Sequence, residues 1–153
     1  MVLSLACPRP VVTVAVVLLL QATQPVIADQ QHTREALGGL AQEMSTCSAF
    51  FALATSVLKR ALPEDTTQAI EHYDTAGKVL LAQAIAIADV IGLDADAPVE
   101  WSRVAMQAMV REINDDPKNS AALMTSKYDE PCQTLLKQSA SRFRALVEGD
   151  TPD

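Results

Sequence analysis

Two cysteines, Cys47 and Cys132, are the side chains most capable of chemistry in this 153-residue sequence. A cysteine acts as a nucleophile only beside a base, usually histidine, and among neighbours that lower its pKa. The two histidines are poorly placed for that role. His32 lies near the expected mature N-terminus, and His72 lies one position off an apolar helix face. We therefore interpret the two cysteines as a disulfide rather than as nucleophiles.

Motifs for metal binding and hydrolysis are missing from the sequence, which contains no HExxH, no CxxC and no G-x-S-x-G. Asp94 and Asp96 resemble the start of a calcium loop, but the pattern lacks its central glycine and final glutamate, and Pro98 interrupts it. Met106 and Met109 could hold a soft ion such as Cu(I), although methionines at helical spacing more often fill a core. We expect no enzyme activity, no catalytic residue, no metal ligand and no cofactor.

Arg103 is a charged residue on an otherwise apolar helix face, close to Trp101 in the sequence. Such a residue either lines a small pocket or lays its aliphatic stem along the surface. A deep pocket formed by Trp101, Arg103 and Tyr73 would indicate a carrier, whereas a solid core with a flat apolar surface patch would indicate a protein binder.

Residues 1–28 have the three parts of a cleavable secretory signal peptide. A positive N-terminal end is followed by an apolar run over residues 11–20 and by small residues before a cleavage point after Ala28. The apolar run is shorter than the roughly 20 residues that span a bilayer, which argues against the alternative of an uncleaved anchor. We expect a periplasmic or secreted protein with one helical domain over residues 29–153 and no stable membrane anchor.

Export would also decide how the cysteines pair. Cleavage removes Cys7, which leaves Cys47 and Cys132 in a compartment where disulfides persist. These two residues then have a single intramolecular pairing available to them.

Composition narrows both the fold class and the partners. Hydrophobic residues make up 49% of the chain and aromatic residues 4%, which favours helix packing over an aromatic-rich β-sandwich. The chain carries 12 Lys and Arg against 19 Asp and Glu, for a formal charge of -7. Because an acidic surface repels phosphate groups, we do not expect nucleic acid or anionic lipid as a partner.

Apolar residues recur in steps of three and four along four stretches, which is the spacing of buried helix faces. The first face runs over residues 37–61, where Pro63 ends it, and the second runs over residues 70–91, where Gly92 ends it. Gly77 would let another backbone approach the second helix, which we expect near the middle of the bundle. The other faces are Val99, Met106, Met109, Val110 and Ile113, and then Cys132, Leu136, Ala140, Phe143 and Val147.

The chain after the third helix has two interpretations. Pro117 either starts a new helix capped by Asp116 or kinks one long helix. A break that sends residues 118–128 across the bundle is favoured, because it brings the two cysteines level with each other. A second break is expected at residues 129–131, where a proline follows two acidic residues.

The sequence thus predicts an all-α fold, an antiparallel bundle of four or five helices stapled by one disulfide between Cys47 and Cys132. For function we expect a small exported, non-enzymatic protein-binding or envelope accessory domain whose partner is another protein. The alternative is a carrier that holds a small apolar ligand or a soft metal between its helices.

Overall fold

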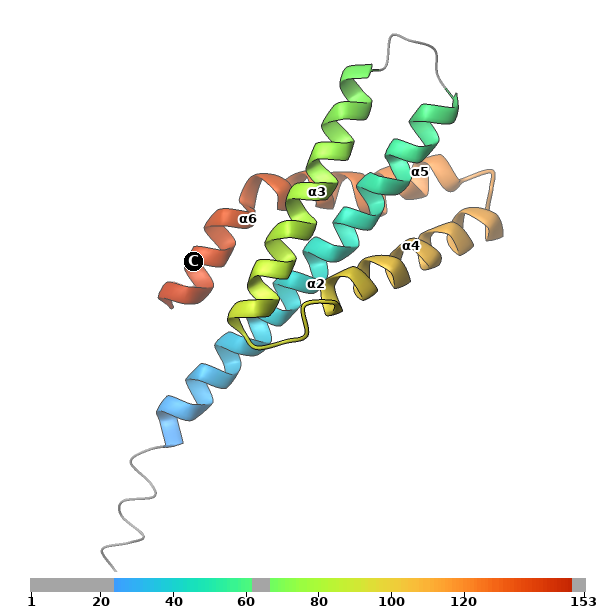
Figure 1. Ribbon diagram of the computed structural model, residues 1–153. Coiled ribbons are helices and arrows are strands. Elements are labelled where there is room, and N and C mark those ends of the chain that lie inside the picture. The colour runs from blue at the N-terminus through green and yellow to red at the C-terminus, as the bar shows by residue number, and fades with distance from the viewer. Residues whose placement is uncertain (1–23, 62–66, 150–153) are drawn as a thin grey trace, which may run out of the picture. The chain divides into compact units, whose positions relative to one another are not determined.

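The computed structural model describes residues 24–61 and 67–149, and every element within these ranges is helical. The elements are α2 (Gln24–Ala61), α3 (Thr67–Val90), α4 (Ala97–Asp115), α5 (Ser120–Met124), the π-helical turn η2 (Thr125–Asp129) and α6 (Glu130–Glu148) (Figure 1). A disulfide links Cys47 of α2 to Cys132 of α6. The prediction of an all-α bundle stapled by one disulfide is confirmed.

The chain divides into two compact units, residues 1–33 and residues 34–153. The predicted signal segment, residues 1–28, falls in the first unit. Residues 1–23 of it lie outside the described part of the chain, and residues 24–28 begin α2. No helix among the described residues is long and apolar enough to cross a membrane. The packing described below is that of the second unit.

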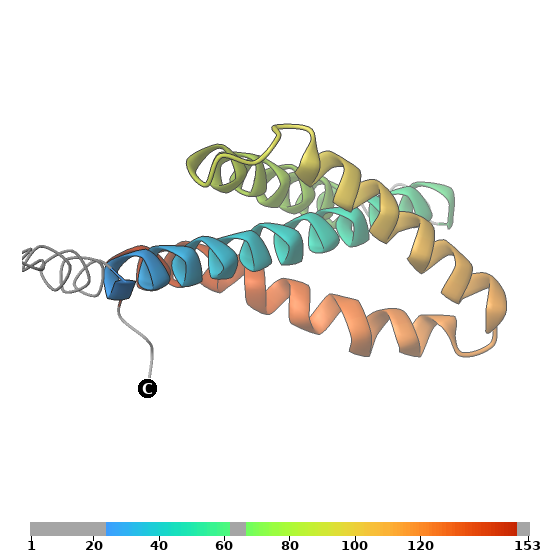
Figure 2. The same cartoon turned by 90° about the horizontal axis from the view of Figure 1, so that it is seen from below.

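Helix α2 lies between α3 and α6 and supplies the largest part of the core (Figure 2). The predicted face is confirmed at Leu37, Leu40, Met44, Cys47 and Phe51, which are all buried. A second row of small residues on the same helix is also buried, namely Ala41, Ser45, Ser48 and Thr55. We expected the alanine-rich α3 near the middle of the bundle; α2 takes that place instead, because it buries two rows of side chains.

Two of the small buried residues of α2, Ser45 and Thr55, bring hydroxyl groups into the core and pair them within their own helix. The Ser45 hydroxyl donates to the Ala41 carbonyl at 2.8 Å, and the Thr55 hydroxyl donates to the Phe51 carbonyl at 2.8 Å. Each of these two hydroxyls donates its hydrogen bond to a carbonyl on the preceding turn of the same helix. Small polar residues are therefore tolerated where two helices pack closely.

Gly77 marks the close approach of α3 to α2. A Cβ atom built on Gly77 would lie 3.3 Å from the Cβ of Phe51 and 3.3 Å from the carbonyl oxygen of Ser48. The prediction that Gly77 admits a neighbouring backbone is confirmed, and the neighbour is α2.

The predicted end of α3 at Gly92 is also confirmed. Gly92 has a φ of +67°, a left-handed conformation that glycine adopts without the steric penalty of a Cβ. The Leu93 N–H donates to the Ala88 carbonyl at 2.8 Å, and the Gly92 N–H donates to the Asp89 carbonyl at 3.0 Å. This pair of bonds is a Schellman motif, which satisfies the last carbonyls of a helix. At the other junction α2 ends at Ala61, and the predicted stop at Pro63 lies outside the described residues.

The apolar faces predicted for α4 and α6 are partly wrong. Of the predicted face of α4, Met109 is fully buried. In α6 the buried residues are Cys132, Leu135 and Ser139. The predicted face residues that are exposed instead are Val99, Val110, Ala140 and Val147. Each helix buries only a narrow part of its surface, so the predicted five-residue stripe is wider than the face that is buried.

The chain breaks near Pro117, as favoured, and the alternative of one long kinked helix is wrong. α4 ends at Asp115 and the next helix begins at Ser120. Asp116 does not cap a helix that starts at Pro117. Its carboxylate accepts hydrogen bonds from the backbone and side-chain nitrogens of Asn119, at 3.3 and 2.9 Å, and so stabilises the turn between the helices.

The second predicted break, at residues 129–131, is wrong. The chain stays helical from Ser120 to Glu148 through η2 and changes direction there (Figure 1). Pro131 has no N–H, and its ring would clash with the carbonyl of Lys127 in a regular α-helix. The wider π-helical turn relieves that clash without ending the helix.

Candidate functional site

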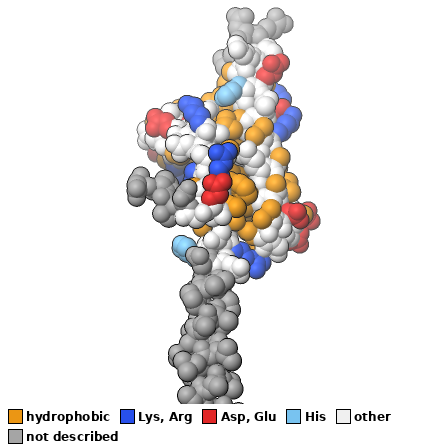
Figure 3. Space-filling model, turned by 90° about the vertical axis from the view of Figure 1, so that its left-hand side faces the viewer, with side chains coloured by type: hydrophobic (Ala, Val, Ile, Leu, Met, Phe, Trp, Pro, Cys, Tyr) orange, Lys and Arg blue, Asp and Glu red, His pale blue; other side chains and the backbone are white. Residues whose placement is uncertain are grey.

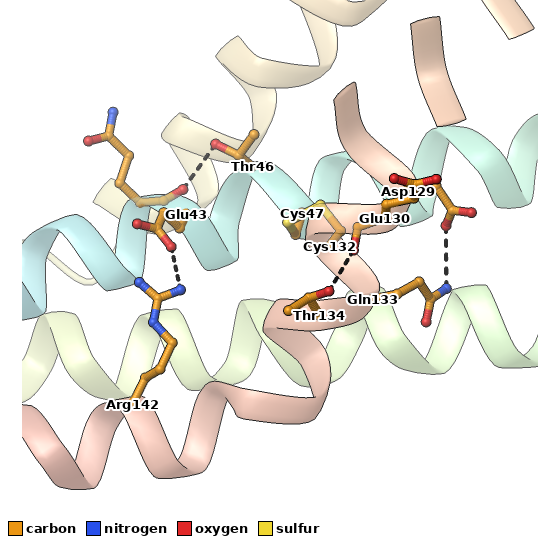
Figure 4. Close-up of a disulfide and its surroundings, with 10 residues drawn as sticks. Glu43, Thr46, Cys47, Asp129, Glu130, Cys132, Gln133, Thr134 and Arg142 are labelled. Carbon is orange, nitrogen blue, oxygen red and sulfur yellow. Dashed lines mark hydrogen bonds and ion pairs between the residues drawn. A yellow bond between two sulfur atoms is a disulfide. The ribbon is translucent and has the colours of Figure 1, made fainter. Parts of the chain in front are cut away.

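The disulfide joins the centre of the core to the first turn of α6. The Cα atoms of Cys47 and Cys132 are 5.2 Å apart, and the two side chains are 6% and 2% exposed (Figure 4). This Cα separation is usual for a disulfide. Because each sulfur is bonded to the other and shielded from solvent, neither is available as a nucleophile.

An ion pair joins the same two helices farther along. The Arg142 guanidinium lies 2.7 Å from the Glu43 carboxylate (Figure 4). Both side chains are about half exposed, and exposed ion pairs contribute roughly 0 to 1 kcal/mol. The disulfide is therefore the stronger of these two links between α2 and α6.

An apolar groove of about 490 Å³ lies between α3 and α6, with Met44 of α2 at its base. We call it the α3–α6 groove; its apolar walls include Ile87 and Val90 of α3 and Phe143 and Val147 of α6. Val90 is 67% exposed and Val147 is 54% exposed. On this side of the molecule apolar side chains form a band with charged residues along its edges (Figure 3). A contiguous apolar surface rimmed by polar residues is a common feature of protein-binding sites, so the groove is a candidate docking surface.

Gln83 adds a polar feature to the wall of the α3–α6 groove. Its side-chain oxygen is buried and has no hydrogen-bond partner among the residues that the structure describes. A buried acceptor without a partner costs about 1 to 3 kcal/mol. A molecule bound in the groove that donated a hydrogen bond to this oxygen would remove that cost.

A second hollow, of about 550 Å³, lies where α2, the start of α3, the end of α4 and the α5–η2 segment meet. We call it the Tyr73 hollow. Its walls include Phe50, Leu53 and Val57 of α2, Ile113 of α4 and Met124 of α5. The Tyr73 hydroxyl donates to Oδ1 of Asp129, which also lines the hollow, at 3.3 Å. Partial burial and the Asp129 carboxylate raise the pKa of Tyr73, which keeps the phenol protonated as a donor.

Aromatic rings and an ion pair hold the wall of the Tyr73 hollow in place. The rings of Phe50 and Tyr128 stack with centroids 6.1 Å apart, and Phe50 meets Tyr73 edge-on at 6.3 Å. The Glu112 carboxylate of α4 accepts from the Lys127 ammonium at 2.6 Å and from the Tyr128 hydroxyl at 3.0 Å. The Lys127 hydrogen bond lowers the pKa of Glu112. These contacts tie α4 and η2 together on one side of the hollow.

The three predicted pocket residues lie in different surroundings. Tyr73 lines the Tyr73 hollow, whereas Arg103 lines a surface depression of α4 beside Met106, and Trp101 packs partly buried against the core. Both an Nε and an Nη atom of Arg103 donate to the carboxylate of Glu100 on the preceding turn. Of the two interpretations of Arg103, the structure agrees with the one that places its side chain along the surface, where its guanidinium pairs with a residue of the same helix.

The candidate metal ligands are dispersed. Met109 is buried in the core, and Met106 packs against that core. Asp94 accepts a hydrogen bond from the Asp96 backbone N–H in an exposed turn. Within residues 24–61 and 67–149, no group of three or more His, Cys, Asp or Glu side chains lies together as a metal site would require.

No known protein family, curated protein or solved structure matches this chain, so its geometry alone carries the functional argument. Sequence reasoning missed both Gln83 and Asp129. A signal for Gln83 was present, since it is a polar residue directly before Ala84 on the buried face of an apolar helix. No sequence signal pointed to Asp129, because its contact with Tyr73 joins two residues that are 56 positions apart in the chain.

Proposed function

We propose that this chain is a small exported domain that binds another protein through the α3–α6 groove and catalyses no reaction. The uncovered apolar groove is the observation that carries the proposal, with Val90 and Val147 exposed along it. The Gln83 side-chain oxygen, which no donor in the described part of the chain reaches, supports it further, because a partner that donates one hydrogen bond there would gain specificity.

The shape of the α3–α6 groove suits an amphipathic helix of the partner. A groove between two helices accepts a third helix, whose apolar side chains at intervals of three and four residues become its anchors. Arg144 and Glu148 lie on the α6 side of the groove and offer one charge of each sign to the polar flank of the incoming helix.

Introducing a positive charge on the apolar surface of the groove tests this proposal. We expect the Val90→Lys and Val147→Lys variants to lose partner affinity by about thirtyfold, since the loss of an interface anchor costs about 2 kcal/mol or more. Tagged wild-type and variant mature proteins would be used to recover partners from the native envelope, with identification by mass spectrometry.

Val110→Lys is the matched control, because Val110 is an exposed valine on α4, away from the α3–α6 groove. A partner retained by Val110→Lys but lost by both groove variants supports the proposal. Recovery of the same partners by all three variants would rule out the groove as the binding surface.

Export is the second part of the proposal. The three-part pattern of residues 1–28 supports it, and the disulfide is compatible with an oxidising compartment. We expect the protein recovered from outside the cytoplasm to begin at Asp29, as measured by intact mass. A full-length species held in the membrane would contradict cleavage after Ala28.

A carrier of a small apolar ligand is the second candidate function, and the Tyr73 hollow favours it. Its volume of about 550 Å³ lies within the range of small-molecule sites, about 300 to 1,000 Å³.

A further inference from the structure

We propose that the Tyr73 hollow binds an organic ammonium ion, in which a protonated amine is carried on a short apolar body. This inference goes beyond protein binding and gives the second candidate function a ligand class. The hollow and the α3–α6 groove share no lining residue, so the two proposals stand or fall separately.

The walls of the hollow suit the apolar body of such a ligand. Leu53, Val57 and Met124 present aliphatic and thioether surface, and Phe50 and Tyr73 present aromatic rings. Aromatic faces attract ammonium groups within about 6 Å of the ring centroid, so these rings favour a cation over a neutral molecule of the same shape.

Asp129 supplies the charge that the cation needs. It is the charged residue among the described residues that line the hollow, and it is half-buried. Its Oδ1 accepts from Tyr73 at 3.3 Å and from Gln133 at 3.4 Å, and both distances are longer than strong hydrogen bonds. No donor from the described residues contacts Oδ2. The carboxylate is thus oriented by two weak bonds and retains acceptor capacity for an ammonium N–H.

The π-helical turn η2 forms part of the wall of the hollow. Thr125 and Asp129, the two ends of η2, both line the hollow. π-Helical turns are rare and occur frequently at functional sites, where the extra residue redirects neighbouring side chains. Here the turn places a hydroxyl and a carboxylate on the same wall.

Other ligand classes fit this combination less well. An anion would meet the Asp129 carboxylate in apolar surroundings, and a neutral hydrocarbon would desolvate that carboxylate without pairing it, which is unfavourable. A calcium ion takes six to eight oxygen ligands, and the hollow offers one carboxylate. An ammonium group needs one such partner and apolar walls for the remainder of the molecule.

Calorimetric titration of the purified mature protein with three eight-carbon probes tests the inference: n-octylammonium, n-octanol and n-octanoate, all below micelle-forming concentrations. We expect n-octylammonium to bind roughly tenfold or more tightly than n-octanol, because charge-assisted hydrogen bonds are about twice as strong as neutral ones. n-Octanoate should bind most weakly. Absence of n-octylammonium binding, or equal binding of n-octanoate, would overturn the inference.

Three variants locate the binding. Asp129→Asn keeps an acceptor for Tyr73 and should abolish the preference for n-octylammonium over n-octanol. Asp89→Asn removes an exposed carboxylate on α3, away from the hollow, and should leave the affinities for n-octylammonium and n-octanol unchanged. Ala121→Trp, at an exposed position that lines the hollow, should fill it and weaken both ligands. Circular dichroism and the melting temperature would confirm that each variant is folded.

The outcomes separate the two proposals. If Asp129→Asn still prefers n-octylammonium over n-octanol, the preference comes from the net acidic charge of the protein and the carboxylate site is overturned. If Ala121→Trp binds both ligands as the wild type does, the ligand lies outside the hollow and the inference is also overturned. The groove variants Val90→Lys and Val147→Lys should bind n-octylammonium as the wild type does, whether or not they retain a protein partner.

Discussion

Replacing Cys47 or Cys132 by alanine is expected to lower the free energy of unfolding by about 4 kcal/mol. The two cysteines are separated by 85 residues, and the chain-entropy model gives roughly 4 to 5 kcal/mol for a closed loop of this length. Domains of this size are stable by about 5 to 15 kcal/mol, so the loss is a large fraction of the total. The melting temperature should fall by about 10 to 15 °C, as measured by circular dichroism.

The double variant provides the internal control for the disulfide. Because the bond is lost with the first substitution, replacement of both cysteines should destabilise little more than replacement of one. Reduction of the wild-type protein should give a similar loss. A single Cys47→Ala variant that keeps its melting temperature and helical signal but loses partner binding would contradict a structural role and point to a thiol used in function.

Replacing Gly77 by leucine is expected to destabilise the bundle by about 2 kcal/mol or more. A Cβ at this position would lie 3.3 Å from the Phe51 Cβ and from the Ser48 carbonyl oxygen, and neither atom can move away by a change of rotamer. Overpacking of this kind costs about 1 to 3 kcal/mol or more, which exceeds the roughly 1 kcal/mol gained by removing a glycine from a helix. Urea unfolding of the purified mature protein measures the difference.

Gly39 is the matched control for Gly77, because both glycines lie inside long helices. A Cβ at Gly39 would meet nothing within 4 Å. Gly39→Leu should therefore stabilise the protein by about 0.5 to 1 kcal/mol through helix propensity alone. The same substitution is thus expected to have opposite signs at the two sites. A destabilisation of similar size at both would show that close packing at Gly77 is not the cause.

Local signals in the sequence were sufficient to predict the helices and several of their ends. Gly92 ends α3 through its own backbone freedom, and the chain breaks at Pro117 because that residue restricts the backbone before it. At residues 129–131 the same kind of reasoning failed. A proline signals only that a regular α-helix is unfavourable, and a π-helical turn is another way to accommodate it.

The two candidate sites were the least predictable features. Val147 was expected to face the core, and in the structure it is exposed along an uncovered groove, whereas Phe143 packs against the core as expected and also lines that groove. Periodicity shows which residues share a face of a helix, but it does not show how much of that face a neighbour covers. The pocket expected from Trp101, Arg103 and Tyr73 failed for a related reason, because sequence proximity and a shared apolar pattern do not place residues on the same wall.

The sequence by itself determined the all-α class, the pairing of Cys47 with Cys132 and the close approach at Gly77. The class and the close approach follow from residue type and helical spacing, and the pairing was predicted from the expected removal of Cys7 with the signal segment, which would leave one available pair. Only the tertiary structure decided that α2 is central, that the Gln83 side-chain oxygen has no partner among the described residues and that Asp129 meets Tyr73. These features depend on how each helix rotates about its axis against its neighbours, which is set by packing summed over the whole core rather than by any local signal.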